Sequence, residues 1–202
     1  ICINSLKLGN QFKLKNKIDS VTFLQMNLFK PCFAPESFDL VICNGVLHHT
    51  GDPLLGYRSI AQLVKKDGYI LLGLYNKYAR LSTELRRMIF NITGNSFRFL
   101  DPRLRDKKVG NLKKNTWFQD QFKNPHESKH TMDEIIHWFE KTGFEFVNSI
   151  PEILPPGEIT ENSNLFSRNP KGSSLDRLFA QLNLMLSGGK EGGFFIMIGR
   201  KI

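Results

Sequence analysis

The segment of residues 37–53 constrains the fold of this chain more than any other part of the sequence. It begins with an apolar run at residues 38–43, which predicts a short buried strand. An Asn-Gly pair at residues 44–45 then indicates a turn, and an Asp-Pro pair at residues 52–53 suits the start of a helix. A parallel α/β sheet presents the residues that follow such a strand at its carboxyl edge, where these sheets bind ligands.

The rest of the chain continues an alternation of strands and helices. The predicted strands are residues 21–26, 38–43, 69–74, 144–150 and 194–200. The predicted helices are residues 4–16, 54–66, 81–92, 132–142 and 175–186. Thr131 suits the N-cap of one helix, with Glu134 completing a capping box. This order predicts one α/β domain with a parallel sheet, helices on both faces and right-handed crossovers.

Two stretches interrupt the alternation. Residues 77–130 predict a basic insertion over the carboxyl edge of the sheet, and residues 151–193 predict a second insertion between the last two strands. The net charge of the chain is +9, and residues 77–114 hold eleven Lys or Arg against three Asp or Glu. Such a segment suits an anionic partner such as RNA, but a solvated helical face with a flexible basic loop is the commoner explanation, since no reading surface with interleaved aromatic residues is evident.

Cysteine use and hydropathy bear on where the chain works. Cys2, Cys32 and Cys43 form no Cys-x-x-Cys pair and no disulfide framework, which favours a reducing, cytoplasmic setting. No apolar run approaches the roughly 18 residues of a membrane-spanning helix, so the sequence predicts no membrane partner.

Residues 38–53 also resemble a known family. Phe-Asp-Leu-Val, followed by Asn-Gly-Val-Leu-His-His and Asp-Pro, is similar to the fourth-strand motif of class I S-adenosylmethionine (SAM)-dependent methyltransferases. The resemblance is specific over residues 21–75, where a Lys-Asp-Gly turn at residues 66–68 precedes the next strand. It implies a Rossmann-like sheet of strand order 3-2-1-4-5-7-6, with the last strand antiparallel, and SAM as the cofactor.

One half of the family's cofactor site is absent from the sequence. No Gly-x-Gly-x-Gly turn occurs near Ile1, and no acidic residue stands where the family binds the ribose. The resemblance therefore implies a methyltransferase sheet truncated at its amino end, without strands one and two. Either this is the carboxyl-terminal part of a longer chain, inactive alone, or a partner polypeptide completes the sheet. Strand three would then lack its neighbour.

The resemblance also assigns site residues. Those implied to bind the cofactor are Asn27, Leu28, Asn44, Gly45, Val46 and His49. Those implied to be catalytic are His48, His49 and Tyr75, and Tyr75 and Asn76 are implied to face the substrate. Each has a structural alternative: Asn27 and Asn76 suit turns, and either histidine could pack or cap. No set of metal ligands has recognisable spacing, His126 and His130 included.

These observations favour the transfer of a methyl group from SAM to an acceptor that the sequence does not identify. The alternative is a noncatalytic, methyltransferase-like module that binds RNA or a protein through residues 77–114. A phosphate-binding loop and a serine nucleophile elbow are both absent from the sequence.

Overall fold

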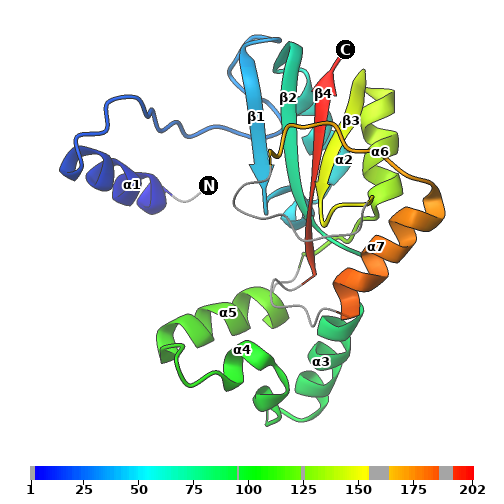
Figure 1. Cartoon of the computed structure of the whole chain (residues 1–202). Coiled ribbons are helices and arrows are strands. Elements are labelled where there is room, and N and C mark those ends of the chain that lie inside the picture. The colour runs from blue at the N-terminus through cyan, green and yellow to red at the C-terminus, as the bar shows by residue number, and fades with distance from the viewer. Residues whose placement is uncertain (1–2, 95, 124–125, 155–163, 187–192) are drawn as a thin grey trace.

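The computed structural model describes residues 3–94, 96–123, 126–154, 164–186 and 193–202, and a mixed four-stranded sheet lies at its centre (Figure 1). The strands are β1 (Phe38–Asn44), β2 (Val64–Tyr75), β3 (Phe144–Ile150) and β4 (Phe194–Lys201), in the spatial order β1-β2-β4-β3. β1 pairs with β2 in parallel, and β4 runs antiparallel to both of its neighbours. The predicted α/β fold and the predicted antiparallel last strand are confirmed.

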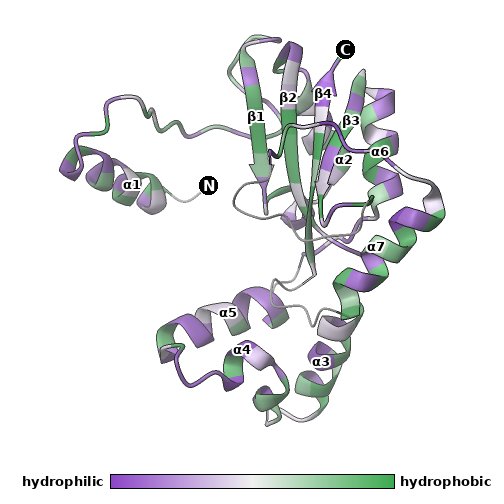
Figure 2. Ribbon diagram, in the orientation of Figure 1, coloured by the Kyte–Doolittle hydropathy of each residue, from purple (hydrophilic) through white to green (hydrophobic). Residues whose placement is uncertain are grey.

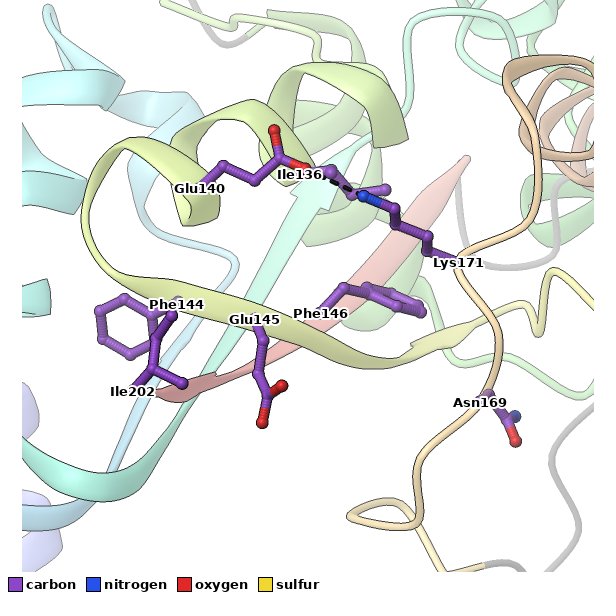
Figure 3. A pocket seen from close by; sticks show the side chains of 8 residues that line it. All are labelled: Ile136, Glu140, Phe144, Glu145, Phe146, Asn169, Lys171 and Ile202. Atoms are coloured by element: carbon purple, nitrogen blue, oxygen red, sulfur yellow. Dashed lines mark hydrogen bonds and ion pairs between the residues drawn. The ribbon is translucent and has the colours of Figure 1, made fainter.

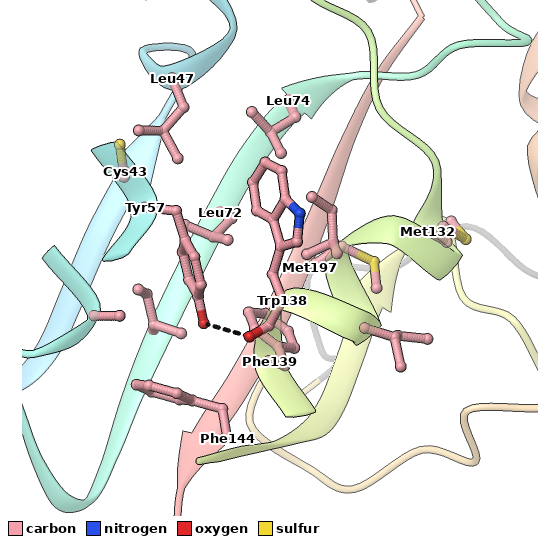
Figure 4. Close-up of a cluster of buried hydrophobic side chains, with 14 of the residues drawn as sticks. Cys43, Leu47, Tyr57, Leu72, Leu74, Met132, Trp138, Phe139, Phe144 and Met197 are labelled. Atoms are coloured by element: carbon pink, nitrogen blue, oxygen red, sulfur yellow. Dashed lines mark hydrogen bonds between the residues drawn. The ribbon is translucent and has the colours of Figure 1, made fainter. Parts of the chain in front are cut away.

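One face of the sheet carries the main hydrophobic core. Helices α2 (Pro53–Ala61) and α6 (Met132–Lys141) pack there, and α7 (Ser174–Leu186) adds Ala180. The ring of Tyr57 in α2 stacks on the ring of Trp138 in α6, with their centroids 5.5 Å apart. Figure 4 shows both side chains within this core. These aromatic rings and the aliphatic residues of β2 and β4 exclude water from this face, so their burial holds both helices on the sheet.

Local capping signals place the starts of both covering helices. The Asp52 carboxylate accepts a hydrogen bond from the Leu55 N–H at 2.9 Å, with proline at the first helical position. The Thr131 hydroxyl accepts one from the Glu134 N–H at 3.2 Å. The N-caps at Asp52 and Thr131 are therefore confirmed. The other half of the predicted capping box is not observed, because the Glu134 carboxylate contacts the His130 ring.

The opposite face of the sheet is covered thinly. Its small cluster comprises Leu71, Val147 and Ile198 with partly buried neighbours, and no helix of the described ranges contributes to it. On β1, Leu40 and Ile42 point to this side and are 40% and 60% exposed. Helices were expected on both faces of the sheet. Within the part of the chain that the structure describes, they cover one face only.

The predicted strand at residues 21–26 is wrong. The segment is extended but pairs with no strand of the described sheet, and Phe23 and Leu24 are 41% and 51% exposed. The physical reason is the missing neighbour, because a strand needs a partner for its backbone groups. Helix α1 (Ile3–Lys15) forms as predicted but buries none of its residues, and Figure 1 shows it lying apart from the sheet.

The predicted end of the helix at residue 66 is also wrong. α2 ends at Ala61, and β2 already begins at Val64. The Lys-Asp-Gly turn lies inside β2 as a bulge: Phe38 pairs with Val64 but Leu40 pairs with Tyr69, and Asp67 has a φ of +65°. Asp67 thus adopts the left-handed conformation that the turn residues suggested, within a strand rather than before one.

A group of helices lies beyond the carboxyl edge of β1 and β2 (Figure 1). It comprises α3 (Leu81–Ile92), the short 3-10 helix η2 (Arg98–Leu100), α4 (Pro102–Arg105) and α5 (Asn111–Lys123). We call residues 81–123 the helical cap. Phe90, Phe118 and Phe122 form its buried centre. α3 has its predicted bounds, whereas α4 and α5 occupy a stretch whose weak periodicity predicted no helix.

Some predicted features lie outside the described residues. These are Cys2 and, within the predicted second insertion, residues 155–163 and 187–192. Within the described ranges, every helix is too short or too polar to cross a membrane.

Candidate active site at the carboxyl edge of the sheet

The loop after β1 leaves the sheet at Gly45. The Gly45 N–H donates to the Gly73 carbonyl of β2 at 3.0 Å, and Gly45 has a φ of +74°, which glycine adopts without steric cost. No atom lies within 4 Å of where a Cβ of Gly45 would stand. Asn44, Gly45 and Val46 are exposed, so together they form an open loop at the end of the strand.

Gly73 makes room for the side chain of Asn44. A Cβ at position 73 would collide with the Asn44 side-chain oxygen and with the ring of Phe194. Because Gly73 has no side chain, the Asn44 amide can lie across β2 at the edge of the sheet. The sequence did not single out Gly73, since its role depends on a partner 29 residues away.

The short 3-10 helix η1 (Leu47–His49) places two histidines side by side. His48 is 1% exposed, and its ring lies 4.1 Å from the Tyr75 ring and 4.2 Å from the His49 ring. Burial lowers the pKa of His48 to about 3, and His49, Arg80 and His130 act in the same direction. His48 is therefore neutral at physiological pH, and its buried Nδ1 has no hydrogen-bond partner among the described residues.

His49 is half-buried at the same edge. Its Nδ1 lies 3.2 Å from the backbone carbonyl oxygen of His126. A carbonyl oxygen only accepts hydrogen bonds, so in the neutral ring Nδ1 carries the proton and Nε2 carries the lone pair. This tautomer gives His49 the form of a general base.

Tyr75 ends β2 and links the edge of the sheet to the helical cap. Its hydroxyl accepts a hydrogen bond from the Gln121 amide at 2.8 Å, and the Arg80 guanidinium lies 3.9 Å from its ring centroid. Burial raises the pKa of Tyr75, so the phenol keeps its proton at neutral pH. Tyr75 can thus donate a hydrogen bond while Gln121 fixes its orientation.

A buried ion-pair network was missed by the sequence interpretation. Arg80 donates to the Glu127 carboxylate at 3.0 Å and 2.5 Å, and Arg87 donates to the same carboxylate at 3.2 Å. The side chains of Arg80 and Glu127 are 0% and 2% exposed. The sequence separation of 47 residues left no periodic signal, and Arg80 counted only as part of the basic segment.

Residues 126–130 run across the ends of both strands. The Ser128 N–H donates to the His48 carbonyl at 2.8 Å, and the His130 N–H donates to the Tyr75 carbonyl at 2.9 Å. The His130 ring then bridges the Ser128 hydroxyl at 2.8 Å and the Glu134 carboxylate at 3.0 Å. These bonds hold His48 and Tyr75 at fixed positions relative to each other.

The remaining predicted site residues have mainly structural contacts. The Asn27 side-chain oxygen accepts from the Phe29 N–H at 2.9 Å, which closes a turn. Leu28 packs against the main core, and its carbonyl accepts from the Ser59 hydroxyl at 2.6 Å. Asn76 is fully buried, where its side chain accepts from two backbone N–H groups and donates to Gln181.

A hollow lies at the other end of the sheet, away from the candidate site. It has a volume of about 420 Å³ and lies between the end of α6, the start of β3 and the end of β4 (Figure 3). An ion pair of 3.1 Å between Lys171 and Glu140 crosses its rim. The predicted site residues all lie at the opposite edge, so this hollow plays no part in the site. In the described ranges, no three potential metal ligands cluster.

Comparisons with known proteins agree with this geometry. The chain is 52% identical over 40 residues to a polyketide synthase-nonribosomal peptide synthetase of Aspergillus clavatus, and 33% identical over 70 residues to the uncharacterized protein syc1184_c of Synechococcus. These matches cover 20% and 35% of this chain but only 1% and 16% of those proteins. The chain thus spans a small part of these relatives.

The solved structure of PKMT2 from Rickettsia typhi shares the fold. It superposes with a TM-score of 0.65 at 10% sequence identity, over 98% of this chain and 42% of that one. A family model described as a methyltransferase domain matches residues 3–143, which is more than half of the chain. The strand order, the open loop after β1 and this match lead to one conclusion: the chain belongs to the methyltransferase domain family.

Proposed function

We propose that this chain is the carboxyl-terminal part of a SAM-dependent methyltransferase with an unidentified acceptor. The observation that carries the proposal is the gathering of Asn44, His49 and Tyr75 at one edge of the sheet. The loop beside them is open, as a ligand site requires.

The residues present fit part of the cofactor. The exposed loop of Asn44, Gly45 and Val46 offers an amide and open space for the methionine portion. Leu28 lies near this loop, because Leu28 and Leu47 would both contact a Cβ at Gly56. Leu28 and Asn27 would border the adenine, although the Asn27 side-chain oxygen is already used in its turn. When bound, SAM supplies an electrophilic methyl group on a sulfonium.

The chemistry left to this chain is alignment and proton removal. His49 is the better base, because its Nε2 carries the lone pair and its Nδ1 is anchored by a carbonyl. The neutral ring of His48 packs against the rings of His49 and Tyr75 and so orients both side chains. Tyr75 would donate a hydrogen bond to the acceptor or to the methionine portion of SAM.

The uncovered side of the sheet supports a larger catalytic unit. The outer edge of β1 has no paired strand in the described residues, and on the open face of the same strand Ile42 is 60% exposed. An apolar edge of this kind is an aggregation hazard unless something covers it. We infer that further polypeptide, in the same chain or in a partner, completes the cofactor site.

The test uses the longest natural chain that contains these residues, with release of S-adenosylhomocysteine as the measurement. His49→Ala should lower turnover by about 100-fold, the usual contribution of a general base. Asn44→Ala should instead weaken SAM affinity, by about tenfold for one hydrogen bond in the site. Lys66→Ala, an exposed change far from the edge, is the matched control. Full activity and normal SAM affinity in both site variants would place the active site elsewhere.

A further inference from the structure

Helix α3 presents an apolar face to solvent. Four of its residues recur at a spacing that follows one side of a helix and are all more than half exposed: Leu81 (51%), Leu85 (55%), Met88 (54%) and Ile92 (78%). We call these four residues the α3 stripe. The helix packs on the rest of the cap through its other side, where Phe90 contacts Phe118 and Phe122. Figure 2 shows α3 with both hydrophobic and hydrophilic residues along its length.

Both arginines of α3 interact with acidic side chains. Arg87 pairs with the buried Glu127 at 3.2 Å, and Arg86 lies 3.9 Å from the Asp101 carboxylate. A surface helix ordinarily exposes charged and polar residues opposite its buried apolar side, whereas α3 exposes a second apolar row opposite the buried Phe90. Four large side chains in one row form a contiguous apolar feature, which marks an interaction surface more often than scattered single residues do.

The same helical cap carries an uncompensated positive charge. Residues 103–114 contain six Lys or Arg and one acidic residue, Asp106. Five of the six are exposed: Arg103, Arg105, Lys107, Lys108 and Lys113. The other acidic residues of the cap have local contacts: Glu84 pairs with Lys129, Asp101 caps α4, and the exposed Asp120 accepts a hydrogen bond from the Gln121 amide at 2.7 Å. Two phenylalanines between these features, Phe97 and Phe99, are 43% and 57% exposed.

We propose that the helical cap binds the surface of a membrane that contains anionic lipid. The α3 stripe would enter the boundary of the acyl chains, and the cations of residues 103–113 would lie among the headgroups. Interfacial helices bind by this combination of buried apolar area and attraction to acidic lipid. This proposal departs from the prediction of no membrane partner, which rested only on the absence of a spanning segment. The bilayer is not crossed, so the proposal agrees with the absence of a spanning helix among the described residues.

Charge and chemistry favour this occupant over two others. A second copy of the cap would bring two strongly basic surfaces together, which costs free energy. A nucleic acid would attract the cations but leave the aliphatic side chains of Leu85, Met88 and Ile92 in water. Anionic lipid satisfies both features at once.

Vesicle flotation of the whole chain tests the proposal. Binding is expected to vesicles of phosphatidylcholine mixed with phosphatidylserine, to weaken with salt, and to be far weaker with phosphatidylcholine alone. Leu85→Gln and Ile92→Gln should each reduce partitioning about tenfold. The matched control is Leu55→Gln, a half-exposed leucine on α2 (50%), which should leave binding unchanged. Lys107→Gln and Lys108→Gln should each reduce it about fivefold, with Lys66→Gln as control.

Three outcomes would overturn the proposal. The first is that the parent chain binds both kinds of vesicle equally, or binds neither. The second is loss of binding only on lysine substitution, with no effect of the α3 stripe. The third is tighter binding of single-stranded polyuridylate that the stripe variants leave unchanged, which would favour the nucleic-acid partner that the basic segment suggested.

Discussion

His48 shows how its surroundings set the chemistry of a single residue. An unfolded chain binds a proton on this ring near the ordinary histidine pKa of about 6.5. Burial against Tyr75 and the nearby positive groups lower the pKa to about 3 in the folded protein. Between these values the unfolded state binds the extra proton, so acidification favours unfolding. The contribution of His48 to stability is complete above pH 6.5 and is lost as the pH falls toward 3.

We therefore predict a steep acid destabilisation that depends on this ring. The free energy of unfolding should fall by about 3 kcal/mol between pH 6.5 and 4 and by up to about 5 kcal/mol below pH 3 from this residue alone, because each pKa unit is worth 1.36 kcal/mol. His48→Phe keeps the ring contacts with Tyr75 and should flatten the pH dependence measured by urea unfolding between pH 6.5 and 4. His137→Gln, on the exposed side of α6, is the control. Parallel pH profiles for His48→Phe and the parent chain would show that the ring is not kept neutral by folding.

At the scale of the elements, the helical cap is joined to the edge of the sheet by an ion-pair network in which Arg80 and Glu127 are fully buried and Arg87 is partly buried. Glu127 accepts hydrogen bonds from Arg80 and Arg87, and Gln121 connects the same network to the Tyr75 hydroxyl. Buried charges are costly when one partner is lost, because the other stays desolvated. The position of the cap over the site thus depends on a few side chains rather than on a large apolar interface.

Arg80→Met should destabilise the protein by about 3 kcal/mol, since Glu127 keeps Arg87 as a partner but loses its main one. Arg80→Met combined with Glu127→Gln should recover part of this loss, because no buried carboxylate then lacks its charge partner. Urea unfolding measures both. The control is Lys171→Met, which breaks a largely exposed ion pair and should cost below about 1 kcal/mol. Equal costs for Arg80→Met and Lys171→Met would contradict the importance of burial.

Hydrophobic periodicity and capping residues correctly predicted the elements that depend on nearby sequence alone. Strand 144–150 and helix 81–92 have their predicted bounds, and the caps at Asp52 and Thr131 form as expected. Strand 21–26 could not be excluded, because an apolar run shows its propensity but not whether a partner strand is present. The site shows the same contrast between local and tertiary signals. Asn44 and Tyr75 end strands and His49 lies shortly after one, which the sequence indicates, whereas the Arg80–Glu127 pair arises only from tertiary contact.

At the scale of the whole molecule, the sheet is covered on one side and unpaired along β1. The sequence also lacks the Gly-rich turn and the acid with which the family holds the ribose and the amino-acid portion of the cofactor. Under the proposed function, the residues present form one side of the cofactor site and further polypeptide supplies the other side.

We predict that these 202 residues alone bind SAM weakly. A hydrogen bond to a charged group contributes roughly 1.5–3 kcal/mol, so the loss of two such contacts lowers affinity about 100-fold or more. Isothermal titration of SAM into the purified chain measures this, with Lys66→Ala as a control for preparation quality. Micromolar binding by a monodisperse sample would mean that another part of this chain supplies the missing contacts.

The position of β4 has a consequence for synthesis on the ribosome. β4 lies between β2 and β3, yet it is made after both, so the two earlier strands have no contact through the sheet until residues 194–201 emerge. Until then β2 and β3 each leave an edge open, and this long-range pairing makes folding slow. A nascent chain of this protein is therefore expected to need protection from aggregation until its last strand is in place.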